Sequence, residues 1–228
     1  MKPFCHSYPA PTTAATFDAL ANEYEVNRLS AWYRSSNEIV LDQIAQNDIR
    51  SLLDIGCATG WLLRQGIKRK LIKDGVGIDI APQMIRVARE AVARQRYRNL
   101  EFIHADWENF EFSHPPTAKF DAIVCAHTLH YFGNPLRAME KIRGHLHHGG
   151  RFYLIERDTT GSALTLLWEA IHQRILREPI RFFSSSQLEE MMHTAGFSAP
   201  GVLTRLRRLF WRKKMFTSVV IMQGIYPK

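Results

Sequence analysis

The stretch LLDIGCATG, residues 52–60, places one acidic residue and three small residues between an apolar run and a helical pattern. Asp54 ends the apolar run, and Gly56, Ala58 and Gly60 follow at alternate positions. Small residues let the backbone approach a ligand closely, and the N-terminus of a helix offers unpaired N–H groups. The spacing is not the G-x-G-x-x-G that presses a pyrophosphate against a helix dipole, and Asp54 would repel such an anion. The loop therefore predicts a ligand with a positively charged amino or sulfonium group.

Two further acidic residues each follow an apolar stretch. In GVGIDIAPQM, Asp79 stands 19 positions after Gly60, where a strand-end carboxylate can accept hydrogen bonds from both hydroxyls of a ribose. In HADWENF, Asp106 could accept a hydrogen bond from an adenine amino group, and Trp107 could stack on the ring. A surface turn with a partly buried tryptophan explains this last stretch equally well.

Candidate acid–base residues lie in HTLHY, residues 127–131. Histidine exchanges a proton near neutral pH, so His127 and His130 are candidate general bases or substrate-orienting groups. Capping of a strand end or a local hydrogen bond is the alternative for each histidine. Tyr24 and Tyr33 could reach the same pocket from the N-terminal segment, although their helical spacing also fits ordinary packing.

Neither a metal site nor a disulfide framework is predicted. The three cysteines form no CxxC pair, and the ten histidines form no HExxH motif. We therefore expect the cysteines to act as small apolar residues in a reducing compartment. The histidines at 145, 147 and 148 are better placed to interact with the C-terminus of a helix than to bind a metal.

The elements that position these residues alternate between strands and helices, which predicts a parallel sheet with helices on both faces. The expected strands cover residues 51–55, 75–80, 100–104, 120–126, 151–156, 202–211 and 216–224. Helices are expected at 15–24, at 30–45, after the small-residue loop to residue 70, from residue 82, from residue 134, and from residue 186 to 196.

Capping residues set two of the helix boundaries. Asn134 and Pro135 are a good N-cap and first-turn pair, and the helix they open is expected to stop at residues 149–150. Ser186 and Glu189 fit a capping box for a later helix.

An extra helical pattern, residues 158–183, follows the fifth expected strand. It either packs on the core or forms a lid, because an element after the C-terminal end of a strand lies where such sheets bind ligands. Trp168 within it is a candidate substrate contact.

The motifs LLDIGCATG, VGIDIAPQM and FIHADWENF, followed by the stretch 120–156, resemble the class I S-adenosylmethionine-dependent methyltransferases. The chain looks most like the small-molecule group that includes the ubiquinone and menaquinone biosynthesis methyltransferases, whose N-terminal cap is similar to FDALANEYEVNR. The resemblance covers roughly residues 51–150. It implies a Rossmann-like, seven-stranded, mostly parallel sheet with helices on both faces and an antiparallel last hairpin. Ala58 is a departure, since many members have glycine there.

The resemblance implies S-adenosylmethionine as the cofactor and S-adenosylhomocysteine as the product. The small-residue loop would line the methionine end, and Asp79 would hold the ribose hydroxyls. The implied cofactor contacts are Asp54, Gly56, Ala58, Gly60, Asp79, Ile80, Asp106, Trp107 and Cys125. Acceptor contacts are expected at Tyr24, Tyr33, Tyr131 and Trp168.

The charge balance indicates anionic partners. Thirty Lys and Arg residues against 22 Asp and Glu residues give a formal net charge of +8. Such a surface attracts a phosphorylated substrate, an acidic acyl carrier protein or nucleic acid. Basic residues concentrate at 86–98 and 205–214, where a simple solvated surface is the alternative. We expect a small-molecule acceptor ahead of nucleic acid, and the sequence does not specify an oligomeric state.

No apolar run approaches the roughly 20 residues of a membrane span, and the N-terminal stretch lacks the apolar core of a secretory signal. We expect one cytoplasmic methyltransferase domain, residues 1–228. Its expected parts are an N-terminal arm and helical cap (1–48), a cofactor-binding core (49–157), the insert (158–183) and a C-terminal helix and hairpin (184–228).

The leading hypothesis is in-line displacement of a methyl group from S-adenosylmethionine to oxygen, nitrogen or carbon of a small molecule. An oxygen or carbon nucleophile often needs a general base, whereas a neutral amine does not. Two alternatives stay open: the same chemistry on RNA or an acyl-carrier-bound substrate, and a catalytically silent cofactor-binding partner subunit.

Overall fold

A computed structural model of the chain describes residues 10–26, 28–113, 118–158, 183–210 and 215–227. Trp168, with nearly all of the predicted insert, lies outside these residues, and so do the basic residues at 211–214. Within the described parts of the chain, no helix is long and apolar enough to cross a membrane.

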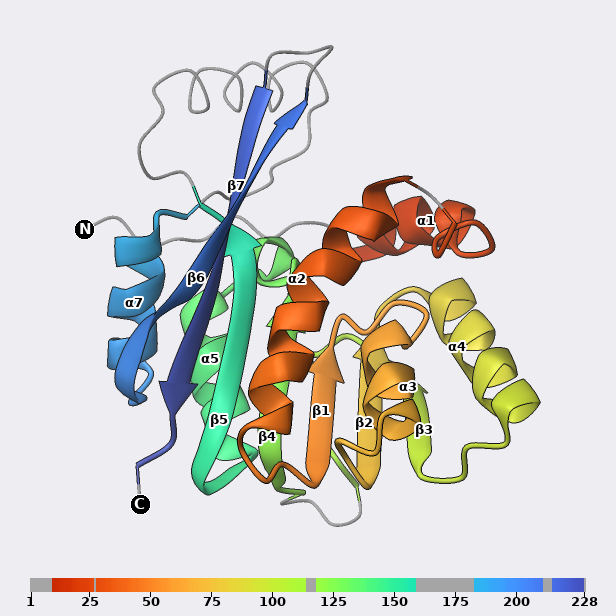
Figure 1. Cartoon of the computed structure of the whole chain (residues 1–228), viewed down its shortest axis with the longest axis horizontal. Coiled ribbons are helices and arrows are strands. Elements are labelled where there is room, and N and C mark those ends of the chain that lie inside the picture. Colours follow the sequence, from red (N-terminus) through yellow and green to blue (C-terminus); the bar gives the residue numbers. More distant parts are fainter. Residues whose placement is uncertain (1–9, 27, 114–117, 159–182, 211–214, 228) are drawn as a thin grey trace.

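A seven-stranded sheet in the order β3-β2-β1-β4-β5-β7-β6 forms the centre of the protein (Figure 1). Strands β1 to β5 pair in parallel, whereas β7 is antiparallel to both β5 and β6. The strands are β1 (Ser51–Ile55), β2 (Asp74–Asp79), β3 (Leu100–His104), β4 (Phe120–Ala126), β5 (Leu146–Arg157), β6 (Ser198–Phe210) and β7 (Met215–Ile225). The predicted mostly parallel sheet with an antiparallel last hairpin is confirmed.

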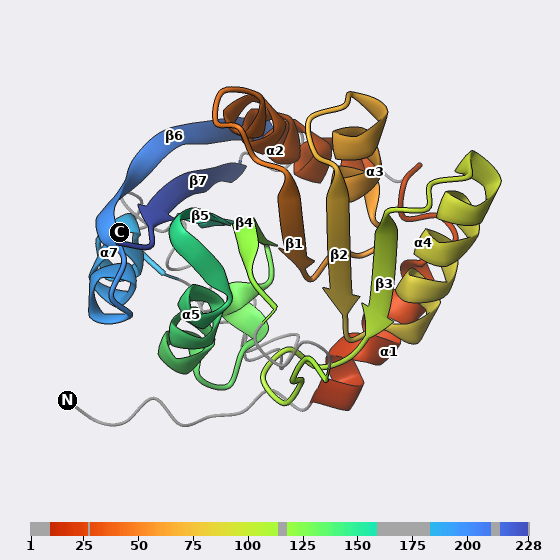
Figure 2. The same cartoon turned by 90° about the horizontal axis from the view of Figure 1, so that it is seen from below.

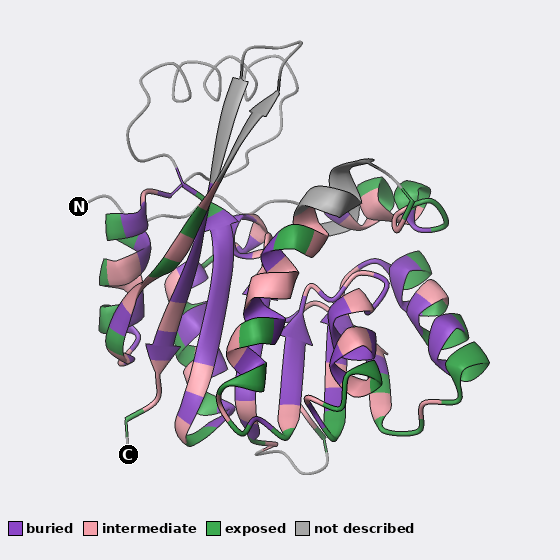
Figure 3. Ribbon diagram, viewed as in Figure 1, coloured by how far each residue is buried: buried purple, intermediate pink, exposed green. Residues whose placement is uncertain are grey.

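Helices cover both faces of this sheet, with α2, α3 and α4 on one side and α5 and α7 on the other (Figure 2). Side chains alternate along a strand, so Leu52 of β1 packs toward the first group and Leu53 toward the second. The central strands β1, β4 and β5 are buried along most of their length (Figure 3). The helices are α1 (Ala10–Leu20), α2 (Arg28–Ala45), α3 (Trp61–Lys68), α4 (Pro82–Gln95), the 3-10 turn η1 (Leu129–Tyr131), α5 (Pro135–Gly144) and α7 (Ser185–Thr194).

The helix α1 and the first turns of α2 lie over the carboxyl ends of β1 and β2 (Figure 1). The helix α1 and the turn after it pack against α4, where Ala21 and Met84 form a small buried cluster with Phe17 and Tyr24 against it. We call α1 and the first turns of α2 the roof, because they cover the edge of the sheet. The roof is distant in sequence from most of the loops that it covers.

The helix α5 stops earlier than its sequence suggests. It ends at Gly144 with His145 as the C-cap residue, and β5 already begins at Leu146, so the predicted stop at residues 149–150 is wrong. The register shift where β4 pairs with β5 lets fully buried Leu146 pair with Phe120. Strand pairing therefore outweighs the tendency of the two glycines to mark the end of a helix.

The capping box of α7 also differs from the prediction. It consists of Ser184 and Gln187, not Ser186 and Glu189. Three consecutive serines compete for the N-cap position, and the buried Ser185 is engaged by a hydrogen bond from Arg205. Ser184 is then the serine whose hydroxyl accepts from the Gln187 N–H.

Candidate cofactor and acceptor site

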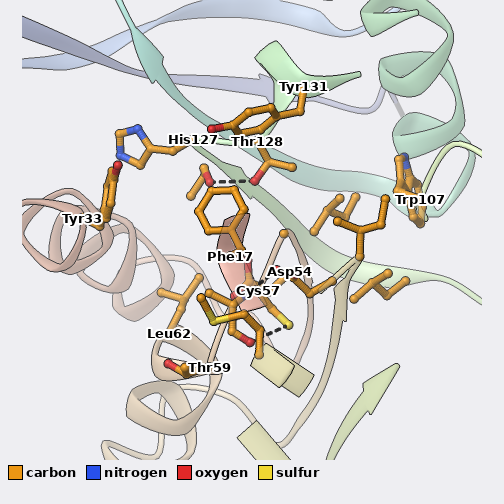
Figure 4. Close-up of a pocket in the computed structure, with 18 of the residues that line it drawn as sticks. Phe17, Tyr33, Asp54, Cys57, Thr59, Leu62, Trp107, His127, Thr128 and Tyr131 are labelled. Carbon is orange, nitrogen blue, oxygen red and sulfur yellow. Dashed lines mark hydrogen bonds between the residues drawn. The ribbon is translucent and has the colours of Figure 1, made fainter. Parts of the chain in front are cut away.

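The carboxyl ends of β1, β2, β3 and β4 open into one pocket (Figure 4). The helices α1 and α2 lie over these strand ends (Figure 1) and contribute residues to the pocket lining. Parallel strands place these ends at one edge of the sheet, where such folds bind ligands. The pocket brings together the predicted residues Tyr24, Tyr33, Asp54, Gly56, Ala58, Asp79, Ile80, Asp106, Trp107, His127, His130 and Tyr131. Two predicted residues do not line the pocket. Cys125 faces the buried core between the sheet and the helices α5 and α7, and Gly60 is the N-cap of α3.

The loop after β1 follows a tight path that favours small residues. Gly56 and Gly60 each have φ of +74°, and Ala58 has φ of +48° in the same left-handed region. A Cβ on Gly56 would overlap the side chain of Thr128, and a Cβ on Gly60 would overlap the ring of Phe102. Gly56 thus leaves room for a pocket residue, whereas Gly60 leaves room for packing behind the loop.

Asp54 and Asp79 form what we call the acid pair at the ends of β1 and β2. Asp54 is 3% exposed, and burial together with the charge of Asp79 raises the pKa of Asp54 to about 7. Asp79 accepts hydrogen bonds from the N–H groups of Ala58 (2.8 Å) and Ala81 (2.9 Å), yet desolvation still raises its pKa. Neither carboxylate forms an ion pair with a described residue. A cationic ligand would relieve the repulsion between them.

The two residues after β3 occupy different environments. Asp106 closes a turn, since its carboxylate accepts hydrogen bonds from the Glu108 N–H (3.0 Å) and the Asn109 side chain (2.7 Å). Trp107 is only 3% exposed, and the Lys141 Nζ lies 4.8 Å from its ring. Both residues line the pocket, and their contacts with an adenine stay predictions.

His127 follows β4 in a backbone conformation that is rare outside glycine. Its φ is +53°, and its N–H donates to the carbonyl of Ile155 at 2.8 Å. Its Nε2 lies 3.2 Å from the Ser36 hydroxyl, and its ring centroid lies 4.7 Å from that of Tyr33 (Figure 4). Burial lowers the pKa of His127 to about 4, so the ring is neutral at physiological pH.

His130 lies in η1 and is paired with a carboxylate that the sequence analysis did not single out. Its Nδ1 lies 2.8 Å from Oε2 and 3.1 Å from Oε1 of Glu156, a residue near the end of β5 that is 1% exposed. Burial raises the pKa of Glu156, but its electrostatic interaction and hydrogen bond with His130 outweigh burial and hold that pKa below its usual value. Glu156 is therefore ionised next to the pocket.

The roof is tied to the loop by Glu25, which follows α1. Its carboxylate accepts hydrogen bonds from the Thr59 hydroxyl (2.7 Å) and the Arg64 guanidinium. Arg34 of α2 donates to the Glu25 carbonyl at 2.9 Å. These contacts join both roof helices to the β1–α3 loop, and the partners of the Glu25 carboxylate are far from it in the sequence.

Aromatic side chains complete the roof. Tyr24 stacks on Tyr33 with ring centroids 6.4 Å apart, and Phe17 meets Tyr131 edge-on at 5.8 Å. Burial raises the pKa of Tyr24, and the nearby Tyr33 and Asp79 raise it further, so its hydroxyl stays protonated. The pocket is therefore acidic at its floor and aromatic under its roof.

Sequence reasoning missed several residues of the site, namely Phe17, Glu25, Arg34, Ser36, Thr128 and Glu156. Most of them come from helices or turns and become neighbours of the pocket only through tertiary packing. Glu156 had a readable signal, because an acidic residue ends the apolar stretch FYLIE.

The sequence profile of the family described as "Methyltransferase domain" matches residues 19–199 of the 228. The chain belongs to the class I S-adenosylmethionine-dependent methyltransferases. The predicted family and enzyme class are thereby confirmed.

Curated relatives agree with this assignment. A demethylmenaquinone methyltransferase from Thermus thermophilus is 26% identical to this methyltransferase over 208 residues, covering 80% of this chain and 91% of that protein. A malonyl-[acyl-carrier protein] O-methyltransferase from Halalkalibacterium halodurans is 30% identical over 106 residues, or 46% of this chain and 38% of that protein. Another from a Paenibacillus species is 26% identical over 156 residues, or 64% of this chain and 55% of that protein. The chain thus spans between 38% and 55% of the length of these two carrier-protein methyltransferases.

Solved structures show the same fold at lower identity. YcgJ from Bacillus subtilis superposes with a TM-score of 0.70 at 18% identity, covering 86% of this chain and 99% of that chain. A phosphoethanolamine N-methyltransferase 2 from Haemonchus contortus gives a TM-score of 0.75 at 14% identity, covering 100% of this chain and 61% of that chain.

Proposed function

We propose that this methyltransferase transfers the methyl group of S-adenosylmethionine to a small-molecule acceptor. The observation that carries the proposal is the acid pair, two carboxylates at adjacent strand ends with no ion-pair partner among the described residues. S-adenosylmethionine carries a sulfonium and an amino group, both cationic, and a ribose whose hydroxyls need acceptors. The chemistry of the donor set therefore fits this cofactor.

When bound, the cofactor supplies an activated methyl group on sulfur. Asp79 would accept from the ribose hydroxyls, because its two backbone hydrogen bonds leave further lone pairs on each carboxylate oxygen. Asp54 would hold the amino group, and the loop at Gly56 and Ala58 would let the chain approach the methionine end. Ile80 and the residues after β3 would contact the adenine.

The other side of the pocket would receive the acceptor. Phe17, Tyr33 and Tyr131 line it, and such an aromatic enclosure would exclude water from the reacting groups. His127 and His130 reach the same space and are the candidates for orienting or deprotonating the acceptor. The chain would thus act mainly by holding acceptor, methyl carbon and sulfur in line.

Calorimetric titration of S-adenosylhomocysteine into the wild type, Asp79→Asn and Asp74→Asn tests the proposal. Asp74 is the matched control, since it begins the same strand but is exposed at the far end. We expect wild type and Asp74→Asn to bind alike and Asp79→Asn to bind at least tenfold more weakly, about 1.4 kcal/mol. A folded wild type that does not bind, or equal binding by Asp79→Asn, would contradict the proposed site.

A carrier-bound acceptor is the second candidate, because two of the relatives are named as methyltransferases of malonyl-acyl carrier protein. Methyl transfer to malonyl-acyl carrier protein but not to free malonyl thioesters would favour it over a free small molecule. Equal rates with both would favour the free acceptor.

A further inference from the structure

The two histidines of the pocket carry their protons on different nitrogens. The Ser36 hydroxyl donates its single proton to the carbonyl of Tyr33, at 2.8 Å. Its 3.2 Å contact with Nε2 of His127 can therefore form only if His127 donates. A neutral His127 then has its proton on Nε2 and its lone pair on Nδ1.

His130 has the opposite arrangement. The ionised carboxylate of Glu156 accepts only, so the short contact with Nδ1 requires a proton on that nitrogen. Nε2 of His130 forms no hydrogen bond with any described residue, and the ring lines the pocket. A neutral His130 held in this way presents a lone pair on Nε2.

Only His130 has a partner that can stabilise the charged ring. A proton taken up at Nε2 creates an imidazolium next to the Glu156 carboxylate, 2.8 Å from Nδ1. His127 has a neutral hydroxyl as its partner instead, and its surroundings oppose protonation. Among the described residues, the other titratable or charged groups around the two histidines are Tyr33 of α2, Cys125 of β4, Arg157 of β5 and Tyr131 of η1.

We propose that Glu156 is a positioning residue that holds His130 as the general base, and that the methyl acceptor is a hydroxyl compound. This inference rests on the proposed methyl transfer. The acceptor oxygen forms a bond to the methyl carbon while the carbon–sulfur bond breaks and its electron pair stays on sulfur. The hydroxyl proton passes to Nε2 of His130, so charge and atoms balance. A carboxylate is already ionised, and a neutral amine attacks without first losing a proton, so neither acceptor would give this base a role.

The tautomers can be read directly from long-range ¹H–¹⁵N spectra of ¹⁵N-histidine-labelled protein bound to S-adenosylhomocysteine. We expect His130 with a protonated Nδ1 and a bare Nε2, and His127 with the reverse, the two being assigned with His130→Gln and His127→Gln. Glu156→Leu removes the acceptor at this position and should change the His130 pattern while leaving that of His127, and Ser36→Ala should do the converse. Glu156→Asp retains a carboxylate and should keep the proton of His130 on Nδ1. A wild-type His130 with its proton on Nε2, or a His130 pattern that Glu156→Leu does not change, would overturn the proposal.

Acceptor chemistry gives the second test. With a panel of phenols, alcohols, amines and carboxylic acids, methyl transfer is expected to hydroxyl compounds, with kcat at least tenfold lower in Glu156→Gln. That loss should shrink as the pH approaches the pKa of a phenolic acceptor, because an ionised phenol needs no base. Transfer confined to amines or carboxylates would overturn the proposal. Loss of S-adenosylhomocysteine binding by the wild type would instead overturn the proposed function, so the two failures are distinguishable.

Discussion

The two ends of the pocket, one proposed for the cofactor and the other for the acceptor, are built in different ways. At the cofactor end, Asp79 is fixed by backbone N–H groups, of which the Ala58 N–H is 21 residues away. At the acceptor end, His127 is fixed by the side chain of Ser36, 91 residues away on a roof helix. The side-chain positions at the cofactor end are held by the backbone of the sheet and its loops, whereas those at the acceptor end depend on how α1 and α2 pack. Substitutions should therefore act through backbone geometry at one end and through side-chain partners at the other.

The largest effect is expected from Gly56→Ala. The added Cβ would overlap Thr128 in a left-handed conformation that disfavours alanine. Left-handed strain of about 1–2 kcal/mol and overpacking of about 1–3 kcal/mol should together lower the free energy of unfolding by roughly 2–5 kcal/mol. Urea unfolding measures it, and binding of S-adenosylhomocysteine should be lost with it.

Gly144→Ala is the matched control, because a Cβ there meets nothing within 4 Å. Its free energy of unfolding should change by less than about 1 kcal/mol. If the two alanine variants were equally stable, the cofactor end would not be defined by its backbone, and the contrast would fail.

The next largest effect is expected from Asp54→Asn, which should change how the free energy of unfolding depends on pH. The pKa of Asp54 rises from 3.8 to about 7 on folding, so the folded chain holds this proton more tightly than the unfolded chain does. The free energy of unfolding of the ligand-free wild type therefore falls through this group as the pH rises between those values. Asp54→Asn lacks this penalty and should be more stable than the wild type at pH 8 by on the order of 1–3 kcal/mol.

The variant minus wild-type difference isolates Asp54 from other groups. Burial lowers the pKa of His127 to about 4, which acts in the opposite direction over the same range but is common to both proteins. Urea unfolding between about pH 5 and pH 8 should show a difference between Asp54→Asn and the wild type that grows with pH. Asp54→Asn should also bind S-adenosylhomocysteine more weakly, although it is more stable. A difference in the free energy of unfolding that did not change with pH would mean that folding does not raise the pKa of Asp54.

The smallest effect is expected at the roof, from Glu25→Gln. Arg64 is 7% exposed and would lose its ion pair, while Thr59 could keep a hydrogen bond to the amide. Loss of a charge-assisted hydrogen bond of this kind should lower the free energy of unfolding by about 1–2 kcal/mol. Affinity for S-adenosylhomocysteine should fall by a few fold, because Thr59 belongs to the loop of the cofactor end.

Glu90→Gln is the matched control for Glu25→Gln, since it breaks the exposed Arg86–Glu90 pair. That pair should contribute less than about 0.5 kcal/mol. Equal effects of the two variants on stability and on affinity would show that the roof is not fastened through Glu25.

Short segments of the sequence predicted an element correctly where the residues of that segment alone set its boundaries. The strands β1 and β4 begin and end at the predicted residues, because short apolar runs bounded by turns leave little choice of boundary. Prediction from short segments failed at residues 149–150, where two glycines read as a helix stop but lie inside β5. It also misplaced the capping box of α7 by two residues, since three serines in a row are equivalent until one of them is buried.

The sequence by itself determined the parallel sheet, the small-residue loop and the acid pair, because strand periodicity and strand-end carboxylates are properties of short segments. The tertiary structure decided the rest of the site. It set Ser36 against His127 and Glu156 against His130, and it tied Glu25 to the loop through Thr59. Such pairs join elements far apart along the chain, and hydrogen-bond partners, burial and the tautomer of a histidine exist only once those elements have packed.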